Sequence, residues 1–569
     1  MSIDITIKIG GEAGQGIQTV GQLLALTCRE AGLYVFGIND FESRIRGGHS
    51  FFQLRISDQQ VRAPHHVVNL LVALDERTVD LHRRQVSPDG MIIVNKKELC
   101  DSPNMLAISF DDLAAQAGDP ITANTVAAGC VLAILHAPFD LFHQVLTNLF
   151  SGKKQSSLDV NLKAGRLGYD AAGDRRCSAA LPWSAALQKK PLIEGSQAIA
   201  YGALAGDCRF AAFYPMSPAT GIMIHLAACQ NDFPLIVEQA EDEIAAANMI
   251  IGASFAGVRS MTATSGGGFC LMTEAIGLAG ITETPCVFIN AQRPGPATGL
   301  ATRTAQADLH MVIRAGQDDF PRFVFAPGSP EQAYAVTSQA LSLAEKYQVP
   351  AIVLVDQFFN DSLYTLEKAF LIPNTIERFV LDHASINNPA EYKRYVFTDS
   401  GISPRALPCQ GTALVKYSGN EHLENGHTSE APEIRTGMVD KRARKLIGMR
   451  SEMQGPEPYY ADAETLLLCW GSTHGVVREA VKMLRQDGIN VGSLHFCDLW
   501  PFPEEKVAPL LSGEKRLIVV EQNSTAQFAQ LLRQQTGISV HGAVLKYNGR
   551  PLYPYEIVNA LKEKEYSHA

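Results

Sequence analysis

The sequence predicts an α/β protein with three units, each built on a doubly wound sheet that helices cover on both faces. Three observations support this class. Short apolar runs typical of strands alternate with longer stretches of helical periodicity. Many of these runs are apolar throughout, which favours parallel strands buried on both faces. Glycine-containing turns follow three of the predicted strands, at residues 10–16, 265–268 and 471–475.

The first unit is expected to span residues 1–178. Strict alternation of polar and apolar residues over 3–9 predicts a half-buried strand, and a helix is expected over 17–31 after the glycine turn. Further strands are expected at 51–56, 68–74 and 91–94, with helices between 121 and 149. A linker is predicted at 171–190, because charged, glycine and small residues are mixed there without a period.

The second unit is expected to span residues 191–400, with a helix at 196–205 and strands at 211–214, 235–237, 287–289 and 351–355. Residues 401–460 are polar and are interpreted as a long irregular connection. The third unit, residues 461–569, starts with a strand at 464–470 and a helix at 476–487. Its other strands are expected at 491–496 and 517–520.

Length, charge and composition exclude several classes of protein. The chain has 569 residues, of which 46% are hydrophobic and 19% charged, so it can bury several cores. Its formal net charge of -10 argues against a nucleic-acid or membrane partner, since either would favour a concentrated basic surface. The basic stretch 441–445 is interpreted as a solvated helix face. No signal segment and no run of eighteen apolar residues is found, so a cytoplasmic protein is expected.

The eleven cysteines are scattered singly along the chain. The nearest pair, Cys270 and Cys286, are sixteen residues apart. Zinc and iron-sulfur sites built from local clusters need much closer spacing. No metal ligand is therefore assigned to this chain, and any iron-sulfur cluster is expected to lie on another subunit.

Two loops between residues 262 and 299 predict a ligand site. Ser265, Gly266 and Gly267 follow an apolar run, and glycines let backbone N–H groups approach a bound molecule. Arg293, between Gln292 and a proline, offers a planar fork for a carboxylate. Two ordinary turns of an α/β domain are the alternative interpretation.

Two polar segments precede these loops. The segment 214–220 contains two prolines and cannot be helical before the second, so Tyr214 and Ser217 project hydroxyls where a strand ends. Ser217 could equally cap the next helix. Glu241 lies with three other acids at the junction between a strand and a helix, where the helix dipole favours negative charge. A carboxylate facing an apolar interior there would have a raised pKa and could share a proton with a ring nitrogen.

Two features of the first unit are candidate anion sites. Gly14 and Gly16 precede a helix N-terminus, where N–H groups favour a phosphate. Arg44 and Arg46 stand just ahead of a glycine pair. Close packing of strand on helix and solvated arginines explain the same residues without a ligand.

Five segments together closely resemble the alpha subunit of 2-oxoacid:ferredoxin oxidoreductases, in the 2-oxoglutarate type with a gamma domain fused in front. They are residues 194–199, 214–218, 239–245, 262–269 and 292–299. Residues 11–16 and 44–48 are similar to the gamma domain. Residues 470–473, 499–503 and 547–551 are similar to the transketolase C-terminal-like domain. The resemblance implies a gamma-type Rossmann-like unit, a thiamine diphosphate pyrimidine-binding-type unit and the transketolase-like unit.

The resemblance also implies an activity and partners. A beta subunit would bind thiamine diphosphate, its Mg²⁺ and a 4Fe-4S cluster, in a dimer of alpha-beta heterodimers. The enzyme would oxidatively decarboxylate 2-oxoglutarate, pass electrons to ferredoxin and transfer the acyl group to coenzyme A, giving succinyl-CoA. Gly14, Gly16, Arg44 and Arg46 would be candidate coenzyme A contacts.

By resemblance, Glu241 contacts the aminopyrimidine and Ser217 takes the place of a threonine near the substrate. Arg293 and Thr302 match positions that face the 2-oxoacid, with Tyr214 nearby. Arg303 replaces the more usual lysine, which keeps the charge but changes its geometry. Ser265, Gly266 and Gly267 are cofactor-binding candidates.

Two alternatives stay open. The substrate could be a branched-chain 2-oxoacid or pyruvate, because Arg293 would hold the C1 carboxylate of any 2-oxoacid. The chain could also be a noncatalytic nucleotide-binding or scaffold subunit that kept the fold.

Overall fold

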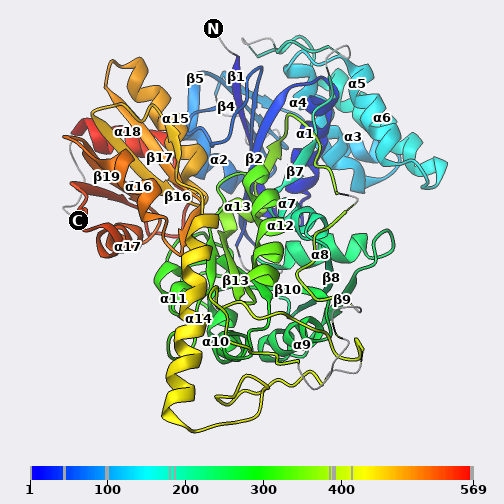
Figure 1. Cartoon of the computed structure of the whole chain (residues 1–569). Coiled ribbons are helices and arrows are strands. Elements are labelled where there is room, and N and C mark those ends of the chain that lie inside the picture. The colour runs from blue at the N-terminus through cyan, green and yellow to red at the C-terminus, as the bar shows by residue number, and fades with distance from the viewer. Residues whose placement is uncertain are drawn as a thin grey trace. The chain divides into compact units, whose positions relative to one another are not determined.

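The structure, a computed structural model, describes residues 3–42, 47–96, 102–177, 181–184, 188–373, 375–382, 386, 392–411 and 414–563. It forms two compact units (Figure 1). Unit 1 consists of Met1–Glu194, Asp361–Ala369 and Tyr553–Tyr555. Unit 2 consists of Gly195–Asn360, Phe370–Leu552 and Glu556–Ala569. Three helix-covered sheets are present, so the predicted α/β class is confirmed.

Unit 1 contains a mixed eight-stranded sheet in the order β6-β5-β4-β1-β3-β2-β14-β7. The strands from β6 to β1 are parallel, whereas β1, β3, β2, β14 and β7 pair antiparallel in turn. The sheet therefore departs from the wholly parallel arrangement, because residues 41–46 between β2 and β3 are too few for a crossover helix. The strands are β1 Asp4–Ala13, β2 Tyr34–Asp40, β3 Gly47–Ser57, β4 Val68–Ala73, β5 Val86–Val94, β6 Met105–Ala107, β7 Leu192–Glu194 and β14 Leu363–Thr365.

The helices of unit 1 pack around α4, whose residues are almost all buried. Glycines let α4 and α6 approach closely, since a Cβ at Gly129 would lie 2.2 Å from the carbonyl oxygen of Gly165. A Cβ at Gly168 would lie 2.0 Å from that of Val126. The helices are α1 Ile17–Glu30, α2 Glu76–His82, α3 Phe110–Ala117, α4 Ala123–Ile134, α5 Phe139–Leu149 and α6 Gln155–Ala171, with 3-10 turns at Arg83–Gln85 and Pro120–Thr122.

The central sheet of unit 2 has the strand order β18-β12-β13-β11-β10-β8-β9. All neighbours are parallel except β12 and β18, and the strands from β10 to β13 are almost fully buried, as apolar runs covered by helices predict. The strands are β8 Cys208–Phe213, β9 Ile236–Gln239, β10 Arg259–Thr264, β11 Cys286–Gln292, β12 Phe323–Phe325, β13 Pro350–Asp356 and β18 Asp498–Trp500. The helices are α7 Gly195–Ala205, α8 Thr220–Cys229, α9 Glu243–Phe255, α10 Gly266–Ile281, α11 Leu309–Ile313, α12 Pro330–Tyr347 and α13 Gln357–Asp361.

The third sheet also belongs to unit 2 and has the order β15-β17-β16-β19-β20. One continuous apolar core joins it to the central sheet, and β18 extends the central sheet although it follows β17 in the chain. The strands are β15 Glu457–Tyr459, β16 Thr465–Trp470, β17 Val491–Phe496, β19 Arg516–Glu521 and β20 Gly542–Leu545. The helices are α15 Thr473–Gln486, α16 Glu504–Leu511, α17 Gln527–Thr536 and α18 Pro554–Glu563.

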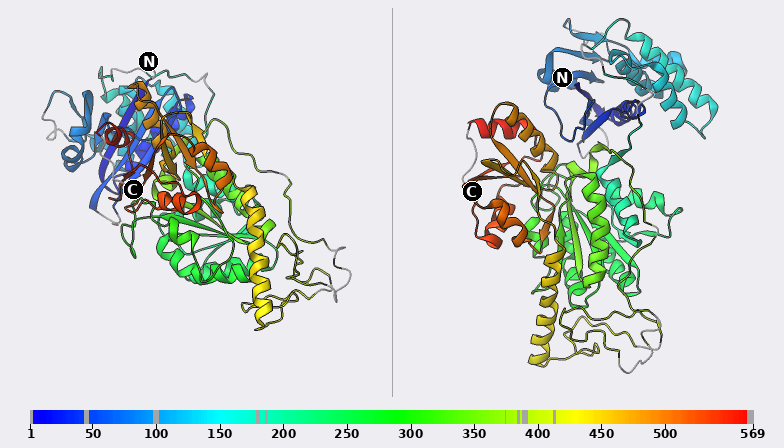
Figure 2. Two further views of the ribbon diagram at one scale, coloured as in Figure 1. Left: turned by 60° about the vertical axis from the view of Figure 1, so that its left-hand side comes forward. Right: turned by 45° about the horizontal axis from the view of Figure 1, so that its top comes forward.

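Two expectations about residues 401–460 were wrong. The segment is not irregular throughout, because α14 spans Pro432–Glu452 (Figures 1 and 2, yellow). Its basic stretch is not solvated either. Lys441 and Lys445 are buried and each places its ammonium nitrogen 2.6 Å from a carboxylate oxygen of buried Glu283, while Arg442 pairs with Glu421 at 2.8 Å. A buried carboxylate requires such cations, and sequence composition does not reveal that requirement.

The two ion pairs of Glu283 fix α14 to the end of α10, whose last residue lies two residues before Glu283. Burial alone would raise the pKa of Glu283, but the ammonium groups of Lys445 and Lys441 hold that pKa below its usual value. The carboxylate is therefore charged, and removing it would leave two buried cations without their partner.

We predict that Glu283→Ala lowers the free energy of unfolding of unit 2 by about 3–5 kcal/mol, the usual cost of breaking a buried ion pair. Urea unfolding followed by the fluorescence of buried Trp470 measures this. Arg435→Ala is the control, because the side chain of Arg435 is 44% exposed where it pairs with Glu421 and Asp318. It should cost about 1 kcal/mol or less. Equal losses in the two variants would contradict the argument.

Candidate active site at the carboxyl ends of the central strands

Four neighbouring parallel strands of unit 2 direct their following loops to one edge of the central sheet. They are β11, β10, β8 and β9, in that spatial order. The carboxyl ends of parallel strands are the usual place for ligands in such sheets. The segment 214–220 follows β8, Glu241 follows β9, Ser265 follows β10 and Arg293 follows β11. The structure thus places at this edge most of the residues that the sequence singled out in unit 2.

Arg293 links two of these loops. Its Nη1 donates a hydrogen bond of 2.7 Å to the backbone carbonyl of Ser217, whereas its Nε is buried without a hydrogen-bond partner among the described residues. Burial lowers the pKa of Arg293, and the negative charge of Glu243 opposes that shift. The side chains of Tyr214 and Ser217 are exposed beside this contact. The guanidinium therefore keeps a donor available for an anion.

The three acids at the start of α9 have different environments. Glu241 is exposed, and Asp242 caps the helix by accepting a hydrogen bond of 2.7 Å from the backbone N–H of Ala245. Glu243 is only 4% exposed, and its Oε1 has no hydrogen-bond partner among the described residues. The sequence predicts a carboxylate facing an apolar interior at this junction, and in this chain Glu243 is the acid in that position. Helical periodicity could have identified Glu243 as the buried acid, because it lies on the same helix face as the apolar residues Ala246, Ala247, Ile250 and Ile251.

The first turn of α10 lies against this carboxylate. A Cβ at Gly268 would be 2.1 Å from Thr264 Oγ1 and 2.9 Å from Glu243 Oε1, so only glycine fits. Ser265 precedes the helix and makes no side-chain cap to it; its hydroxyl lies 2.7 Å from the sulfur of Met216. The N-terminal N–H groups of α10, which begins at Gly266, thus lie close to Glu243 and to the 214–220 segment.

Thr302 and Arg303 lie further along the Arg293 loop. The loop folds back on itself, with the N–H of Leu300 bonded to the carbonyl of Pro294 at 3.0 Å. Thr302 is buried, and a Cβ at Gly549 would lie 3.2 Å from Cβ of Arg303. The structure thus brings Arg303 beside the 547–551 turn of the third sheet.

Sequence reasoning missed the polar groups inside β11. Asn290 and Gln292 are buried, and Asn290 donates a hydrogen bond of 3.1 Å to Asp308. Burial raises the pKa of Asp308, whose carboxylate oxygen would lie 2.5 Å from a Cβ at Gly266. Two buried amides in an otherwise apolar strand were the signal, since buried polar groups need partners.

Comparisons with known proteins identify the family. Residues 201–441 match the family described as pyruvate flavodoxin/ferredoxin oxidoreductase, thiamine diphosphate-binding. Residues 6–171 match pyruvate ferredoxin/flavodoxin oxidoreductase, and residues 463–557 match pyruvate:ferredoxin oxidoreductase core domain II. The 2-oxoacid:ferredoxin oxidoreductase subunit alpha of Sulfolobus sp is 32% identical over 97% of this chain and 96% of its own length. The chain belongs to the 2-oxoacid:ferredoxin oxidoreductase alpha subunits.

Two further relatives of this alpha subunit are named for one substrate. The 2-oxoglutarate synthase subunit KorA of Methanothermobacter thermautotrophicus is 32% identical over 65% of this chain and 97% of its own length. A solved structure of 2-oxoglutarate:ferredoxin oxidoreductase from Magnetococcus marinus contains 2-oxoglutarate, coenzyme A and succinyl-CoA. It is 30% identical over 99% of both chains, with a TM-score of 0.87. The suspected family is thereby confirmed, and the chain is part of an oxidoreductase.

Unit 1 of the alpha subunit has a separate cavity of about 480 Å³, which Gly14, Asp75, Glu76, Lys96 and Asp111 help to line. Its three acids outnumber the one lysine, so these side chains do not favour a phosphate. Gly16 lies close to Asn124, because a Cβ there would be 2.0 Å from the amide nitrogen. This contact supports the close-packing explanation of Gly16. Arg44 and Arg46 lie outside the described residues.

No helix in the described part of the alpha subunit is both long and apolar enough to cross a membrane.

We predict that Gly268→Ala lowers the activity of the assembled enzyme by about 100-fold, because the added methyl group displaces Glu243 or Thr264. Steady-state turnover and the circular-dichroism melt measure activity and folding separately. Gly277→Ala on the same helix is the control, since its Cβ would meet no atom closer than 3.5 Å. That variant should keep its activity and gain up to about 1 kcal/mol of stability. Full activity in the Gly268 variant would show that the first turn of α10 tolerates a side chain.

Proposed function

We propose that this alpha subunit works in an enzyme that oxidatively decarboxylates 2-oxoglutarate with coenzyme A and ferredoxin, reversibly giving succinyl-CoA and CO₂ in the cytoplasm. Two relatives named for 2-oxoglutarate support this substrate. The match of residues 201–441 to a thiamine diphosphate-binding family supports the cofactor. Thiamine diphosphate supplies an electron sink for the carbanion left after CO₂ departs.

The buried carboxylate of Glu243 carries the proposal. An unpartnered buried carboxylate costs free energy unless a ligand supplies the missing partner. A ring nitrogen of the aminopyrimidine would supply it, and Glu243 would then hold a proton at that nitrogen. Glu241, by contrast, is exposed on this chain. We therefore assign the role of the aminopyrimidine contact to Glu243.

We place the substrate carboxylate at Arg293, at the same edge of the sheet. Arg293 is held in place by the carbonyl of Ser217 and keeps N–H groups for an anion. Ser217 is brought to Arg293 by this hydrogen bond, Tyr214 belongs to the same 214–220 segment, and Thr302 lies in the same loop as Arg293. Arg303 is our candidate for the distal carboxylate that distinguishes 2-oxoglutarate from pyruvate or a branched-chain 2-oxoacid.

An apolar face next to the site supports a partner subunit. Ile224 on α8, Ile236 on β9, Ile244 and Met249 on α9 and Leu271 on α10 are exposed. The elements are neighbours, since α8 and β9 contact each other and α9 packs against α10. Exposed apolar side chains grouped in this way mark protein interfaces. A beta subunit that holds thiamine diphosphate, Mg²⁺ and a 4Fe-4S cluster is the proposed occupant, in a dimer of alpha-beta heterodimers.

Unit 1 is proposed to assist coenzyme A, with Gly14 at the cavity described above. Gly16, Arg44 and Arg46 remain candidate contacts. Because the described lining of that cavity is acidic, cations from the 43–46 segment would have to supply the positive charge that coenzyme A phosphates need.

We predict that Glu243→Gln leaves the complex assembled with its cofactor bound but lowers the turnover number by roughly two to four orders of magnitude, the usual scale of acid-base assistance. Stopped-flow reduction of ferredoxin measures the turnover, and cofactor content is measured in parallel. Glu241→Gln is the matched control and should turn over nearly normally. The reverse pattern would return the role to Glu241.

We predict that Arg303→Ala raises the Michaelis constant for 2-oxoglutarate far more than for pyruvate, by an amount on the order of 1–3 kcal/mol for a buried charged hydrogen bond. Arg293→Ala should impair both substrates, because both carry the C1 carboxylate. Steady-state kinetics with 2-oxoglutarate and with pyruvate measure the Michaelis constants of both variants. Equal losses for both substrates in the Arg303 variant would place the distal contact on the beta subunit.

A further inference from the structure

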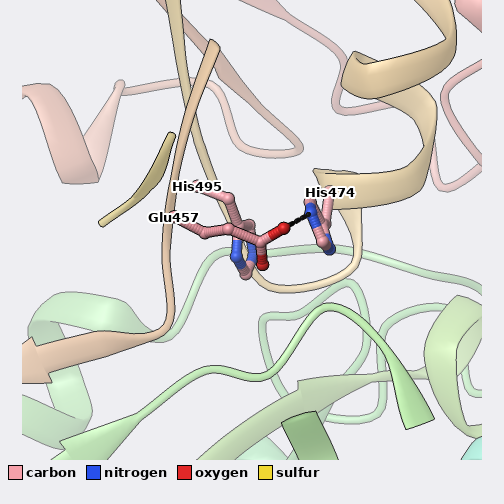
Figure 3. Close-up of side chains that lie close together, drawn as sticks. All are labelled: Glu457, His474 and His495. Carbon is pink, nitrogen blue, oxygen red and sulfur yellow. Dashed lines mark ion pairs between the residues drawn. The ribbon is translucent and has the colours of Figure 1, made fainter. Parts of the chain in front are cut away.

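A second group of polar side chains lies in the third sheet, at the strands and helix that follow α14. Among the described residues, Glu457 on β15, His474 on α15 and His495 on β17 form the group that could hold a metal ion. Their donor atoms all lie within 4.8 Å of one another. Figure 3 shows the carboxylate of Glu457 beside both imidazole rings. The three residues are far apart in the sequence, so spacing gave no signal for them.

His495 is held in the form that binds metals. Its Nε2 lies 3.2 Å from the carbonyl oxygen of Gly471, so this nitrogen carries the hydrogen. Its Nδ1 lies 3.4 Å from the amide nitrogen of Gln332, which can only donate, so Nδ1 offers a lone pair. A backbone carbonyl that fixes the ring in this way is typical of histidine ligands.

His474 supplies a second imidazole. It is 8% exposed, and its ring stacks on that of His495 with centroids 4.1 Å apart. Its Nε2 lies 3.6 Å from Oε1 of Glu457, and its Nδ1 is buried without a hydrogen-bond partner among the described residues. Nε2 is therefore the nitrogen of His474 that faces the carboxylate, and the unpartnered Nδ1 leaves the ring without a hydrogen bond that would fix it in another orientation.

Glu457 is the adaptable member of the group. It is 43% exposed, and it accepts hydrogen bonds from Gln332 at 2.9 Å and from Arg478 at 2.8 Å. Ligand atoms bonded to zinc at about 2.1 Å are about 3.4 Å apart in a tetrahedron, so the group must contract modestly. An exposed glutamate on an edge strand can make that movement. Arg478 competes with a cation for the same oxygen.

We propose that Glu457, His474 and His495 form a binding site for a divalent transition-metal ion of the zinc class, with three protein ligands and water in the fourth position. Two imidazoles and one carboxylate are a donor set that zinc accepts. This inference does not depend on the proposed function and departs from the expectation that the chain holds no metal ligand.

The site would add a link between elements that already pack together, since β15 pairs antiparallel with β17 and Glu457 lies opposite His495. β15 is the edge strand of the third sheet, whereas β17 lies inside it and α15 covers it. Gln332 on α12 contacts both Glu457 and His495, so the same point also reaches the helices of the central sheet. A bound ion would hold β15 against β17 and α15. Because the ion would bind only the folded chain, it would stabilise the folded state.

The test uses the full-length chain, stripped with a chelator and dialysed against zinc sulfate. One zinc ion per chain is expected by elemental analysis, together with a rise in melting temperature. Co²⁺ used as a probe should give visible absorption bands of a four-coordinate site. Glu457→Gln should weaken zinc binding about tenfold or more without altering the fold, because the substituted side chain is partly exposed.

Two further variants sharpen the result. Arg478→Gln should strengthen zinc binding, because it removes the cation that competes for Glu457 Oε1. His143→Ala, an exposed histidine on α5, should leave binding unchanged. Zinc uptake that is absent in the wild-type chain, or equal in the wild-type chain and the Glu457 variant, would overturn the proposal and leave a simple hydrogen-bonded cluster.

Discussion

The ion pairs of Glu283 with Lys441 and Lys445 set the position of α10, and the candidate active site depends on that helix. Glu283 follows the last residues of α10, while Gly266 and Gly268 at the other end contact Asp308 and Glu243. A helix is a rigid rod, so anchoring one end with buried charges restricts the other. The two buried carboxylates therefore have opposite roles. Glu283 is paired within the chain, whereas Oε1 of Glu243 has no hydrogen-bond partner among the described residues.

The sequence predicted the α/β class and the loops that carry the site, because strands, glycine turns and helices leave local patterns. It could not show which of the neighbouring acids the fold buries, and in this chain Glu241 is exposed whereas Glu243 is buried. Composition also misled for residues 441–445, where a basic run on a helix is usually solvated. The distant partner Glu283 reverses that expectation, and no local pattern contains it.

Long-range contacts account for the rest of the difference. Arg303 lies beside Gly549, and His474 beside Glu457 and His495. The mixed sheet of unit 1 depends on the same kind of contact, because β14 reaches it from the middle of the chain. Each of these contacts joins residues that only the folded chain brings together. Residue type and spacing therefore indicate which chemistry a side chain can perform, but not which distant side chains the fold brings next to it.

The insertion of β14 between β2 and β7 also has a consequence for how the polypeptide can be divided. A fragment ending at residue 178 would contain β2 but neither β14 nor β7, although Leu363 and Tyr364 pair with Gly37 and Phe36. The backbone of β2 would then form an open sheet edge, which invites self-association. Covalent order and structural units thus disagree in this chain. If a gene fusion joined unit 1 to unit 2, the sheet of unit 1 would come to depend on β14, whose residues are encoded almost two hundred codons after residue 178.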